Sequence, residues 1–354
     1  MRALVLAGGS GTRLRPITYT RAKQLVPLAN KPILFFGLEA IAAAGIHEVG
    51  IVVGDTEPDI RAAVGDGSQF GLSVTYLRQD APLGLAHAVL IARDFLGDEP
   101  FVMYLGDNLV VGGIDSFVGE FAQQHPCAMV LLHTVDHPEQ FGVAELGPDG
   151  HLVRLVEKPA SPPSDLALVG IYLFDARIHQ AVRAIQPSAR GELEITDAIQ
   201  WLLDRGHTVR PHILEAPWID TGKLTDLLDA NQIVLEGLTT SIEGVVDDAS
   251  SLDGTVIVGP GAQVIASELR GPLVIGASTK VVRSVIGPSV SLGPDCEVID
   301  STIEHAVLLE GARISQVDRI VDSLIGRSAQ VAGSPSATST YRLHIGDHSD
   351  VSVG

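Results

Sequence analysis

Short apolar runs alternate with amphipathic stretches along the first part of the chain, up to about Leu235. The runs are four to six residues long, and the stretches between them repeat apolar residues at helical spacing. The runs predict strands at 2–7, 49–53, 74–77, 101–105 and 128–133. The stretches predict helices at 33–44, 59–64, 85–95 and 114–124. Strands that alternate with helices are typical of a mostly parallel sheet covered by helices on both faces.

Three later apolar runs, at 143–146, 152–156 and 168–174, have less helix between them. They predict either an insertion or an extension that makes the sheet mixed. In parallel sheets, ligands bind beyond the carboxyl ends of the strands. The segments GGSGTR, after the first strand, and GDN, after Leu105, are therefore placed to meet a ligand.

A different period begins at about Thr239, where apolar residues recur every five or six positions. They are Ile275, Val281, Ile286, Leu292, Val298, Ile303, Leu309, Ile314, Ile320 and Ile325. Three related segments, SVIGPSV, STIEHAV and SLIGRSA, repeat within this region, before small residues at 333–340 interrupt the pattern. This spacing predicts a parallel β-helix, whose flat faces pair readily with another subunit. The predicted domains are therefore 1–238 and 239–354, and we expect a homo-oligomer formed through the β-helix.

Composition limits the classes of protein that the sequence can represent. Hydrophobic residues make up 45% and charged residues 19%, which is typical of a folded globular chain. No apolar run approaches the ~20 residues that span a membrane, and Ala3–Ala7 is too short for a signal-peptide core. We therefore expect a cytoplasmic protein that does not bind membranes. Cys127 and Cys296 lie far apart and outside any zinc-site spacing.

The net charge of −19 argues against nucleic acid as a partner, because such proteins need basic surface to displace phosphate counterions. The first 31 residues nevertheless contain six basic side chains and no acidic one. A local positive region in an acidic protein suits a small polyanion. A solvated basic edge is the alternative.

The GGSGTR segment contains neither the Gly-Lys-Ser/Thr of a P-loop nor the third glycine of the dinucleotide fingerprint. Its glycines still allow a tight turn that directs backbone N–H groups at phosphate oxygens, and Arg13 adds a bidentate donor. Lys23, ten residues on, is a second candidate for binding phosphate. An ordinary turn and a surface lysine are the alternatives.

Two aspartates stand where a metal ion could bind. Asp107 follows an apolar strand, and Asp220 lies between a strand-like segment ending at Trp218 and a helix beginning near Lys223. Two carboxylates suffice for Mg²⁺, because substrate phosphates and water complete its shell. A turn aspartate is the alternative for Asp107, and a helix N-cap is the alternative for Asp220.

Twelve histidines are present, but no metal-binding spacing links them. His305 stands apart because β-helices with this rung length also form acyltransferases that use a histidine base. A surface or core histidine is the alternative.

Several motifs together resemble those of the glucose-1-phosphate thymidylyltransferase family, in its long form with a C-terminal left-handed β-helix. In chain order they are LAGGSGTRLRP, AKQLVPLANKPIL, GDN, EKP, GELEITDAI and WIDTGKLTDLLDAN. The resemblance covers nearly the whole chain. It implies an α/β fold, with a Rossmann-like, mostly parallel mixed sheet followed by a left-handed parallel β-helix.

The resemblance also implies roles for individual residues. Nucleotide-phosphate contacts are implied for Gly8, Gly9, Gly11, Thr12 and Arg13. Arg13 and Lys23 are the two implied catalytic residues, which would stabilise the negative charge that shifts between phosphate groups during transfer. Thymine contacts are implied for Gln79 and Gly84, and magnesium ligands for Asp107 and Asp220. A sugar-phosphate pocket is implied for Gly142, Glu157, Lys158 and Val169.

The implied reaction joins dTTP and glucose 1-phosphate into dTDP-glucose and pyrophosphate with Mg²⁺ as cofactor, for deoxysugar biosynthesis. Leu109 and Val110 stand where the family often has aromatics, and Trp218 stands alone where a pair is common. Three alternatives are a UTP-dependent uridylyltransferase, a bifunctional enzyme with an acyltransferase β-helix, and a non-catalytic sugar-nucleotide sensor.

Overall fold

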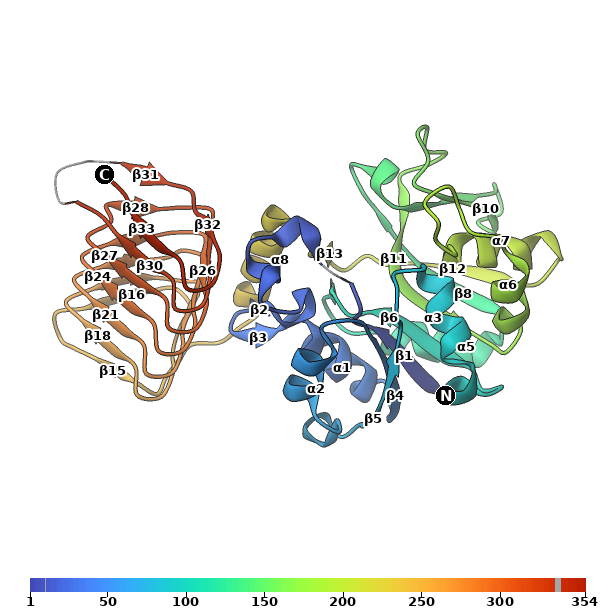
Figure 1. The fold of residues 1–354 in the computed structure, drawn as a ribbon, viewed down its shortest axis with the longest axis horizontal. Helices are drawn as coiled ribbons and strands as arrows, with labels where there is room; N and C mark the ends of the chain where they lie inside the picture. Colours follow the sequence, from blue (N-terminus) through green and yellow to red (C-terminus); the bar gives the residue numbers. More distant parts are fainter. Residues whose placement is uncertain (10, 335–338) are drawn as a thin grey trace. The chain divides into compact units, whose positions relative to one another are not determined.

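The structure, a computed structural model, describes residues 1–9, 11–334 and 339–354 (Figure 1). The chain divides into two compact units. The sheet unit comprises Met1–Ser10 and Ile33–Asp220, and the β-helix unit comprises Gly11–Pro32 and Thr221–Gly354. Residues 11–32, which contain five basic side chains and no acidic one, are called the basic segment below. Part of the interruption predicted at 333–340 lies outside the described residues.

The sheet unit is built on a nine-stranded mixed sheet. Its strands are β1 (Arg2–Leu6), β4 (Glu48–Val53), β5 (Ser73–Arg78), β6 (Phe101–Leu105), β8 (Ala128–Thr134), β9 (Gly142–Leu146), β10 (Leu152–Glu157), β11 (Leu166–Phe174) and β12 (Val209–Ile213). The main path runs β10-β9-β11-β6-β1-β4-β5. Strands β6, β1, β4 and β5 are parallel, as predicted, whereas β11 is antiparallel to β6. The later runs therefore form the mixed extension.

Seven helices accompany the described strands of this unit. They are α1 (Ile33–Ala43), α2 (Glu57–Val64), α3 (Leu85–Ile91), α4 (Arg93–Leu96), α5 (Asp115–Gln124), α6 (Ile178–Ala184) and α7 (Ile195–Asp204). The single helix predicted at 85–95 is wrong, because the backbone at Ala92, with ψ of 1°, interrupts it. Helices α6 and α7 have no counterpart among the predicted helices.

Alternation along the central strands explains why helices cover both faces of the sheet. Leu4 and Met103 belong to the apolar core that includes α3, α6 and α7. Tyr104, the next residue along β6, points to the other face, where its ring packs against Gly37 of α1. Side chains of successive strand residues point to opposite faces, so a run that is apolar at every position requires cover on both.

A short antiparallel ribbon lies outside the main sheet. It pairs β7 (Asn108–Val110) with β13 (Trp218–Asp220), and Asp220 stands opposite Asn108. The strand-like segment predicted to end at Trp218 therefore continues to Asp220.

The β-helix unit contains twenty short strands in three parallel sheets (Figure 1). The first sheet contains β14 (Ser241–Ile242), β17 (Val256–Val258), β20 (Leu273–Ile275), β23 (Val290–Leu292), β26 (Ala306–Leu308), β29 (Ser323–Ile325) and β32 (His344–Ile345). The second contains β15 (Val245–Val246), β18 (Gln263–Ile265), β21 (Lys280–Val282), β24 (Glu297–Ile299), β27 (Arg313–Ser315), β30 (Gln330–Ala332) and β33 (Asp350–Ser352). The third contains β16 (Ser251–Asp253), β19 (Glu268–Arg270), β22 (Val285–Ile286), β25 (Thr302–Ile303), β28 (Arg319–Ile320) and β31 (Thr340–Tyr341).

Each turn of this coil takes about three predicted rungs. Ser267, Ser284 and Ser301 stack at intervals of 17 residues, and each hydroxyl accepts a hydrogen bond from the backbone N–H of the next turn. All ten apolar residues that predicted the period are buried. The parallel β-helix is thus confirmed, and its three sheets are consistent with the left-handed form.

One helix and the basic segment complete the β-helix unit. Helix α8 (Leu224–Glu236) follows Lys223, whose N–H donates to Asp226 Oδ2 at 3.0 Å. Asp220 is therefore not its N-cap, and that alternative is wrong, because Asp226 supplies the capping carboxylate. The strands β2 (Pro27–Leu28) and β3 (Lys31–Pro32) of the basic segment lie beside α8 (Figure 1). Among the described helices, none is long and apolar enough to cross a membrane.

Candidate functional site

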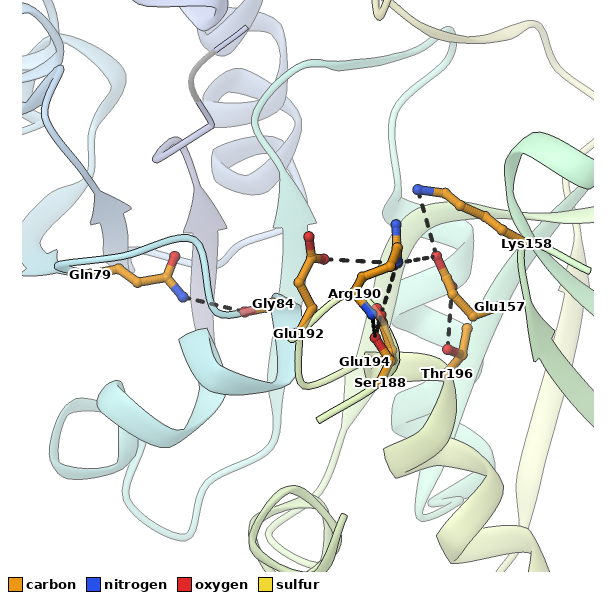
Figure 2. Close-up of polar contacts among 9 residues, drawn as sticks. All are labelled: Gln79, Gly84, Glu157, Lys158, Ser188, Arg190, Glu192, Glu194 and Thr196. Carbon is orange, nitrogen blue, oxygen red and sulfur yellow. Dashed lines mark hydrogen bonds and ion pairs between the residues drawn. The ribbon is translucent and has the colours of Figure 1, made fainter. Parts of the chain in front are cut away.

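A network of charged side chains occupies the end of the sheet unit where β10 meets α7. Figure 2 shows Arg190 between two carboxylates: its Nη2 lies 3.0 Å from Glu157 Oε1 and 2.9 Å from Glu194 Oε1. Thr196, in the first turn of α7, donates its hydroxyl to Glu157 Oε2 at 3.2 Å. Ser188 donates to Glu194 Oε1 at 2.7 Å. Every carboxylate oxygen but one in this pair thus has a fixed donor.

Burial and the neighbouring Glu194 carboxylate raise the pKa of Glu157, and Lys158, Arg190 and Thr196 partly offset this rise. Glu157 is mostly buried, with 22% of its side chain exposed, while Glu194 is 5% exposed. Glu194 also stands at the N-terminus of α7, where the helix dipole favours a negative charge. The site therefore contains two neighbouring carboxylates that form ion pairs with the same arginine.

The other residues implied for the sugar phosphate adjoin Glu157. Gly142 is its direct partner across the β9–β10 pair. Lys158 Nζ lies 3.8 Å from Glu157 Oε1, and the lysine is about half exposed. Val169 is fully buried in β11, so its role in a sugar-phosphate pocket stays a prediction. The structure thus brings Gly142, Glu157 and Lys158 together.

The two residues implied for the nucleotide base, Gln79 and Gly84, also contact each other. Gln79 Nε2 donates to the carbonyl oxygen of Gly84 at 3.3 Å (Figure 2). The same atom lies 3.0 Å from His87 Nδ1. Leu193 accepts a hydrogen bond from Ala86 N–H and donates one to the carbonyl oxygen of Leu83. Because Leu193 lies between Glu192 and Glu194, the base-side loop and the charged network are joined through one segment.

Arg190 is the functional candidate that the sequence predictions missed. It precedes the GELEITDAI motif, and its partner Glu157 is 33 residues away. The available signal was the spacing of Glu192 and Glu194, two and four residues after a basic side chain. That spacing alone does not distinguish a site from a solvated turn.

The two candidate metal ligands lie at one end of the β7–β13 ribbon. Asp107 occupies the turn between β6 and β7. Asp220 pairs across the ribbon with Asn108, the residue that follows Asp107. Asn108 is buried, and the Trp218 indole N–H donates to its Oδ1 at 2.6 Å. Asn108 Nδ2 lies 3.5 Å from Asp107 Oδ1. The ribbon therefore places the two carboxylates on neighbouring positions and fixes the residue between them.

These donors fit Mg²⁺, which takes one or two protein carboxylates and completes its shell with water and substrate phosphate. Both aspartates are partly exposed, as such a site requires. The described residues contain no group of three or more His, Cys, Asp or Glu that could hold a metal alone. Any ion held here would thus depend on the substrate for its remaining ligands.

The glycine-rich segment is divided between the units. Gly8 and Gly9 follow β1 in the sheet unit, half-buried and exposed respectively. Gly11, Thr12, Arg13 and Lys23 belong to the basic segment of the β-helix unit. The predicted phosphate-binding residues thus belong to two units, with Gly8 and Gly9 in the sheet unit and the others in the β-helix unit.

Gly11 is the position where the basic segment needs a glycine. Its φ of 60° is left-handed, and a Cβ there would lie 2.9 Å from Lys23 Cβ and 3.0 Å from Thr18 Cγ2. Thr18 also donates its hydroxyl to the Gly11 carbonyl oxygen at 2.7 Å. Lys23 is consequently buried, with 6% exposure, so the interpretation as a surface lysine is wrong.

Arg13 is exposed and packs against a second glycine. A Cβ on Gly222, in the WIDTGK motif, would lie 3.0 Å from Arg13 Nη1. The guanidinium therefore occupies the space that any side chain at 222 would need. Thr12, beside it, is also exposed.

His305 in the β-helix carries a separate arrangement. Its Nδ1 lies 2.8 Å from Asp322 Oδ1, and Arg342 Nε donates to Asp322 Oδ2 at 2.9 Å. The hydrogen bond from His305 and the charge of Arg342 hold the pKa of Asp322 low. These residues line a hollow of about 440 Å³ together with Leu224 and Leu228 of α8.

The chain is similar in sequence to known proteins. The nucleotidyl transferase family model matches residues 2–237. The chain is 58% identical to a glucose-1-phosphate thymidylyltransferase of Streptomyces griseus, over 100% of this chain and 99% of that protein. A second protein of that name, from Streptomyces antibioticus, is 55% identical over the same shares.

A solved structure extends the comparison to the fold. It is described as a glucose-1-phosphate thymidylyltransferase of Bacillus anthracis in complex with sucrose, is 36% identical, and has a TM-score of 0.63. The match covers 68% of this chain and 97% of that one. From its sheet, its motifs and these full-length relatives, the chain belongs to the nucleotidyl transferase family.

Proposed function

We propose that this protein transfers a thymidylyl group from dTTP to glucose 1-phosphate, forming dTDP-glucose and releasing pyrophosphate. The observation that carries the proposal is the 58% identity to a thymidylyltransferase along the entire chain, β-helix included. The polar network around Glu157 supports it, because a carboxylate beside a half-exposed lysine suits a sugar that bears a phosphate.

In the proposed reaction, a phosphate oxygen of glucose 1-phosphate attacks the α-phosphorus of dTTP. The new P–O bond forms as the bond to the bridging oxygen of pyrophosphate breaks, so no covalent enzyme intermediate is needed. The protein must align two polyanions and neutralise the charge that develops at the α-phosphoryl and leaving groups. Arg13 and Lys23 are the proposed catalytic residues, and Glu157 would accept hydrogen bonds from sugar hydroxyls.

Asp107 and Asp220 are the proposed ligands of Mg²⁺, which would supply positive charge next to the triphosphate. Gly8, Gly9, Gly11 and Thr12 would contact the phosphates through backbone and hydroxyl donors.

Release of pyrophosphate with dTTP or UTP, across a panel of sugar 1-phosphates, tests the proposal. We expect the highest kcat/KM with dTTP and glucose 1-phosphate. The methyl group that distinguishes thymine from uracil contributes only about 1 kcal/mol in an apolar pocket, so UTP should retain measurable activity. Higher kcat/KM with UTP would favour a uridylyltransferase. No release with any pair would favour a sugar-nucleotide sensor.

We also propose that the β-helix assembles subunits. Its first turn exposes Val245, Ile242 and Leu252, with 66%, 44% and 42% of each residue accessible. They lie on the first strands of the three sheets, so exposed apolar side chains stand at one end of the β-helix, where another subunit could cover them. Light scattering of a Val245→Asp/Leu252→Asp variant tests this: an unchanged molar mass would remove the assembly role from this turn.

Acyl transfer in the β-helix is a second candidate, which the His305–Asp322 pair favours. The carboxylate at Nδ1 orients the imidazole, and Nε2, which is buried and has no hydrogen-bond partner among the described residues, is the candidate base. Isothermal calorimetry with acetyl-CoA tests it, and the absence of binding would dismiss it.

A further inference from the structure

The basic segment is packed into the same unit as α8 and the β-helix, although it precedes most of the sheet unit in the chain. We propose that Asn231, Ser291 and Asp347 are positioning residues that hold the basic segment in its active conformation. The β-helix would then contribute to nucleotidyl transfer as a rigid support for Arg13 and Lys23. This inference rests on the proposed function.

Asn231 joins three elements at one atom. Its Oδ1 accepts a hydrogen bond from Ala29 N–H at 2.8 Å and another from Ser291 Oγ at 2.7 Å. Ala29 belongs to the basic segment, Asn231 to α8, and Ser291 to β23 of the β-helix. Asn231 and Ser291 are both fully buried, so water cannot replace either bond. Breaking one therefore leaves a buried polar group without its partner.

The neighbouring residue repeats this connection. Asn30 Nδ2 donates to the carbonyl oxygen of Leu292 at 2.7 Å, one residue beyond Ser291. Ala29 and Asn30 both have positive φ, 46° and 66°, in the turn that links β2 and β3. Two hydrogen bonds thus hold this turn in a left-handed conformation that non-glycine residues rarely adopt, and Ser291 supports one of them through Asn231.

Asp347 anchors the middle of the segment. Thr20 donates its hydroxyl to Asp347 Oδ2 at 2.8 Å, and Arg327 N–H donates to Oδ1 at 2.7 Å. The Asp347 side chain is fully buried, although Thr20 itself is exposed. The carboxylate is therefore fixed by the last turns of the β-helix before it binds Thr20.

A third connection lies next to Arg13. The His344 side chain forms a hydrogen bond with the backbone of Leu14. Burial lowers the pKa of His344, and this hydrogen bond partly offsets the decrease. Pro16 packs beside it, because a Cβ on Gly346 would lie 3.1 Å from Pro16 Cβ. The β-helix thus contacts the segment near Leu14, at Thr20 and at Ala29, on both sides of Lys23.

These anchors are consistent with a positioning role rather than general stabilisation. The basic segment has five positive charges and no acid, so its own side chains repel one another. The hydrogen bonds that Thr20, Ala29 and Asn30 make to the rest of this unit use neutral donors, so the anchors do not depend on the arginine and lysine charges. A displacement of about 1 Å in a catalytic group can cost roughly 100-fold in rate.

The test uses full-length variants and separates positioning from folding. Ser291→Ala and Thr20→Val should each lower kcat roughly three- to tenfold, as the loss of one hydrogen bond predicts. The KM for glucose 1-phosphate should stay unchanged, since the sugar-side residues are not in this segment. Thr20→Ser, which keeps the hydroxyl, should restore kcat.

Ser284→Ala is the matched control, because Ser284 is an equally buried β-helix serine whose partners all lie within the β-helix. It should lower the melting temperature as much as Ser291→Ala but leave kcat unchanged. Equal kcat losses in the two variants, or none in either, would overturn the proposal.

Hydrogen exchange distinguishes this inference from the proposed function. Ser291→Ala and Thr20→Val should accelerate exchange of the Leu14, Leu25 and Val26 amides, which close turns within the segment. This measurement needs no turnover. Wild-type protein without pyrophosphate release would refute the proposed function while exchange still decides the anchoring. Normal turnover of the wild type with unaltered exchange and kcat in both variants would refute the anchoring alone.

Discussion

The charged network around Glu157 and the basic segment, the two regions proposed to bind the substrates, differ in the balance of their charges. In the network, Arg190 is shared by Glu157 and Glu194, so most of its charge is already neutralised within the protein. In the basic segment, five positive side chains face no acid in the same stretch of sequence. The first region thus contains acidic and basic side chains together, whereas the second contains only basic ones within its own sequence.

The two regions are also held by different forces. Ion pairs to Arg190 organise the network, with Thr196 and Ser188 as supplementary donors. Close packing at Gly11 and neutral hydrogen bonds organise the basic segment. Substitutions of charge should therefore alter pH dependence and sugar affinity in the first region. In the second, loss of charge and loss of shape should both lower the rate of transfer.

The largest effect should come from Arg13→Ala. Removal of a donor that stabilises transition-state charge costs roughly 100- to 1,000-fold in kcat. We expect kcat and kcat/KM to fall together in steady-state assays of pyrophosphate release. Arg15→Ala is the control in the same segment, because Arg15 stacks on Tyr19 with its Cζ 4.8 Å from the ring centre. A change confined to KM would reduce Arg13 to a ground-state contact.

Asp107→Asn should follow, with a fall of roughly 100-fold in kcat at saturating magnesium, since a carboxylate ligand supplies charge that an amide lacks. The measurement is kcat as a function of Mg²⁺ concentration. Asp98→Asn is the control, because Asp98 is an exposed carboxylate paired with Arg93. Turnover within a few-fold of wild type would show that Asp107 holds no catalytic metal.

Part of this comparison was predictable from sequence. Apolar runs of strand length specified the parallel core of the sheet, and the five- to six-residue period specified the β-helix, because both patterns reflect burial along one local element. The acid-free stretch around Arg13 was visible directly in the sequence. Each of these features can be recognised within a short stretch of sequence.

The contacts that complete each region are not local. Thr20 and Asp347 are 327 residues apart, and Arg190 and Glu157 are 33 apart, so no spacing rule joins them. Asp220 was predicted to lie between a strand and a helix, but its alternative as a helix N-cap failed because Lys223 takes that position and Asp226, at N3, supplies the capping carboxylate. The predicted domain 1–238 included residues 11–32, whereas their contacts place them in the β-helix unit.

Gly222→Ala tests shape without changing charge. The new methyl group would overlap the Arg13 guanidinium, and displacement of that group should lower kcat about tenfold. Gly237→Ala is the matched control, because a Cβ there meets nothing closer than 3.6 Å. Steady-state kinetics on both variants would check the prediction. Identical kcat values would mean that Arg13 tolerates displacement and that packing at Gly222 is unimportant.

The smallest effect should be a shift in pH dependence from Glu194→Gln. Because the pKa of Glu157 is raised, Glu157 gains a proton at a higher pH than an ordinary glutamate as the solution is acidified. Protonated Glu157 accepts hydrogen bonds poorly, so the KM for glucose 1-phosphate should begin to rise at that higher pH. Removal of the Glu194 charge lowers the pKa of Glu157, and the rise in KM should then begin at a lower pH.

Glu192→Gln provides the comparison for this shift. Glu192 Oε2 lies 3.8 Å from Arg190 Nη2, and its charge is not among the causes of the raised pKa of Glu157. The onset of the KM rise should therefore move in Glu194→Gln and stay in place in Glu192→Gln. The contribution of Glu157 to the stability of the fold should follow the opposite trend to activity. A pKa that is raised in the folded state adds stability below the unfolded-state pKa, and this contribution is lost as the pH rises through the folded-state pKa. Equal shifts in both variants would mean that the shared arginine, rather than repulsion between two buried acids, controls the ionisation of Glu157.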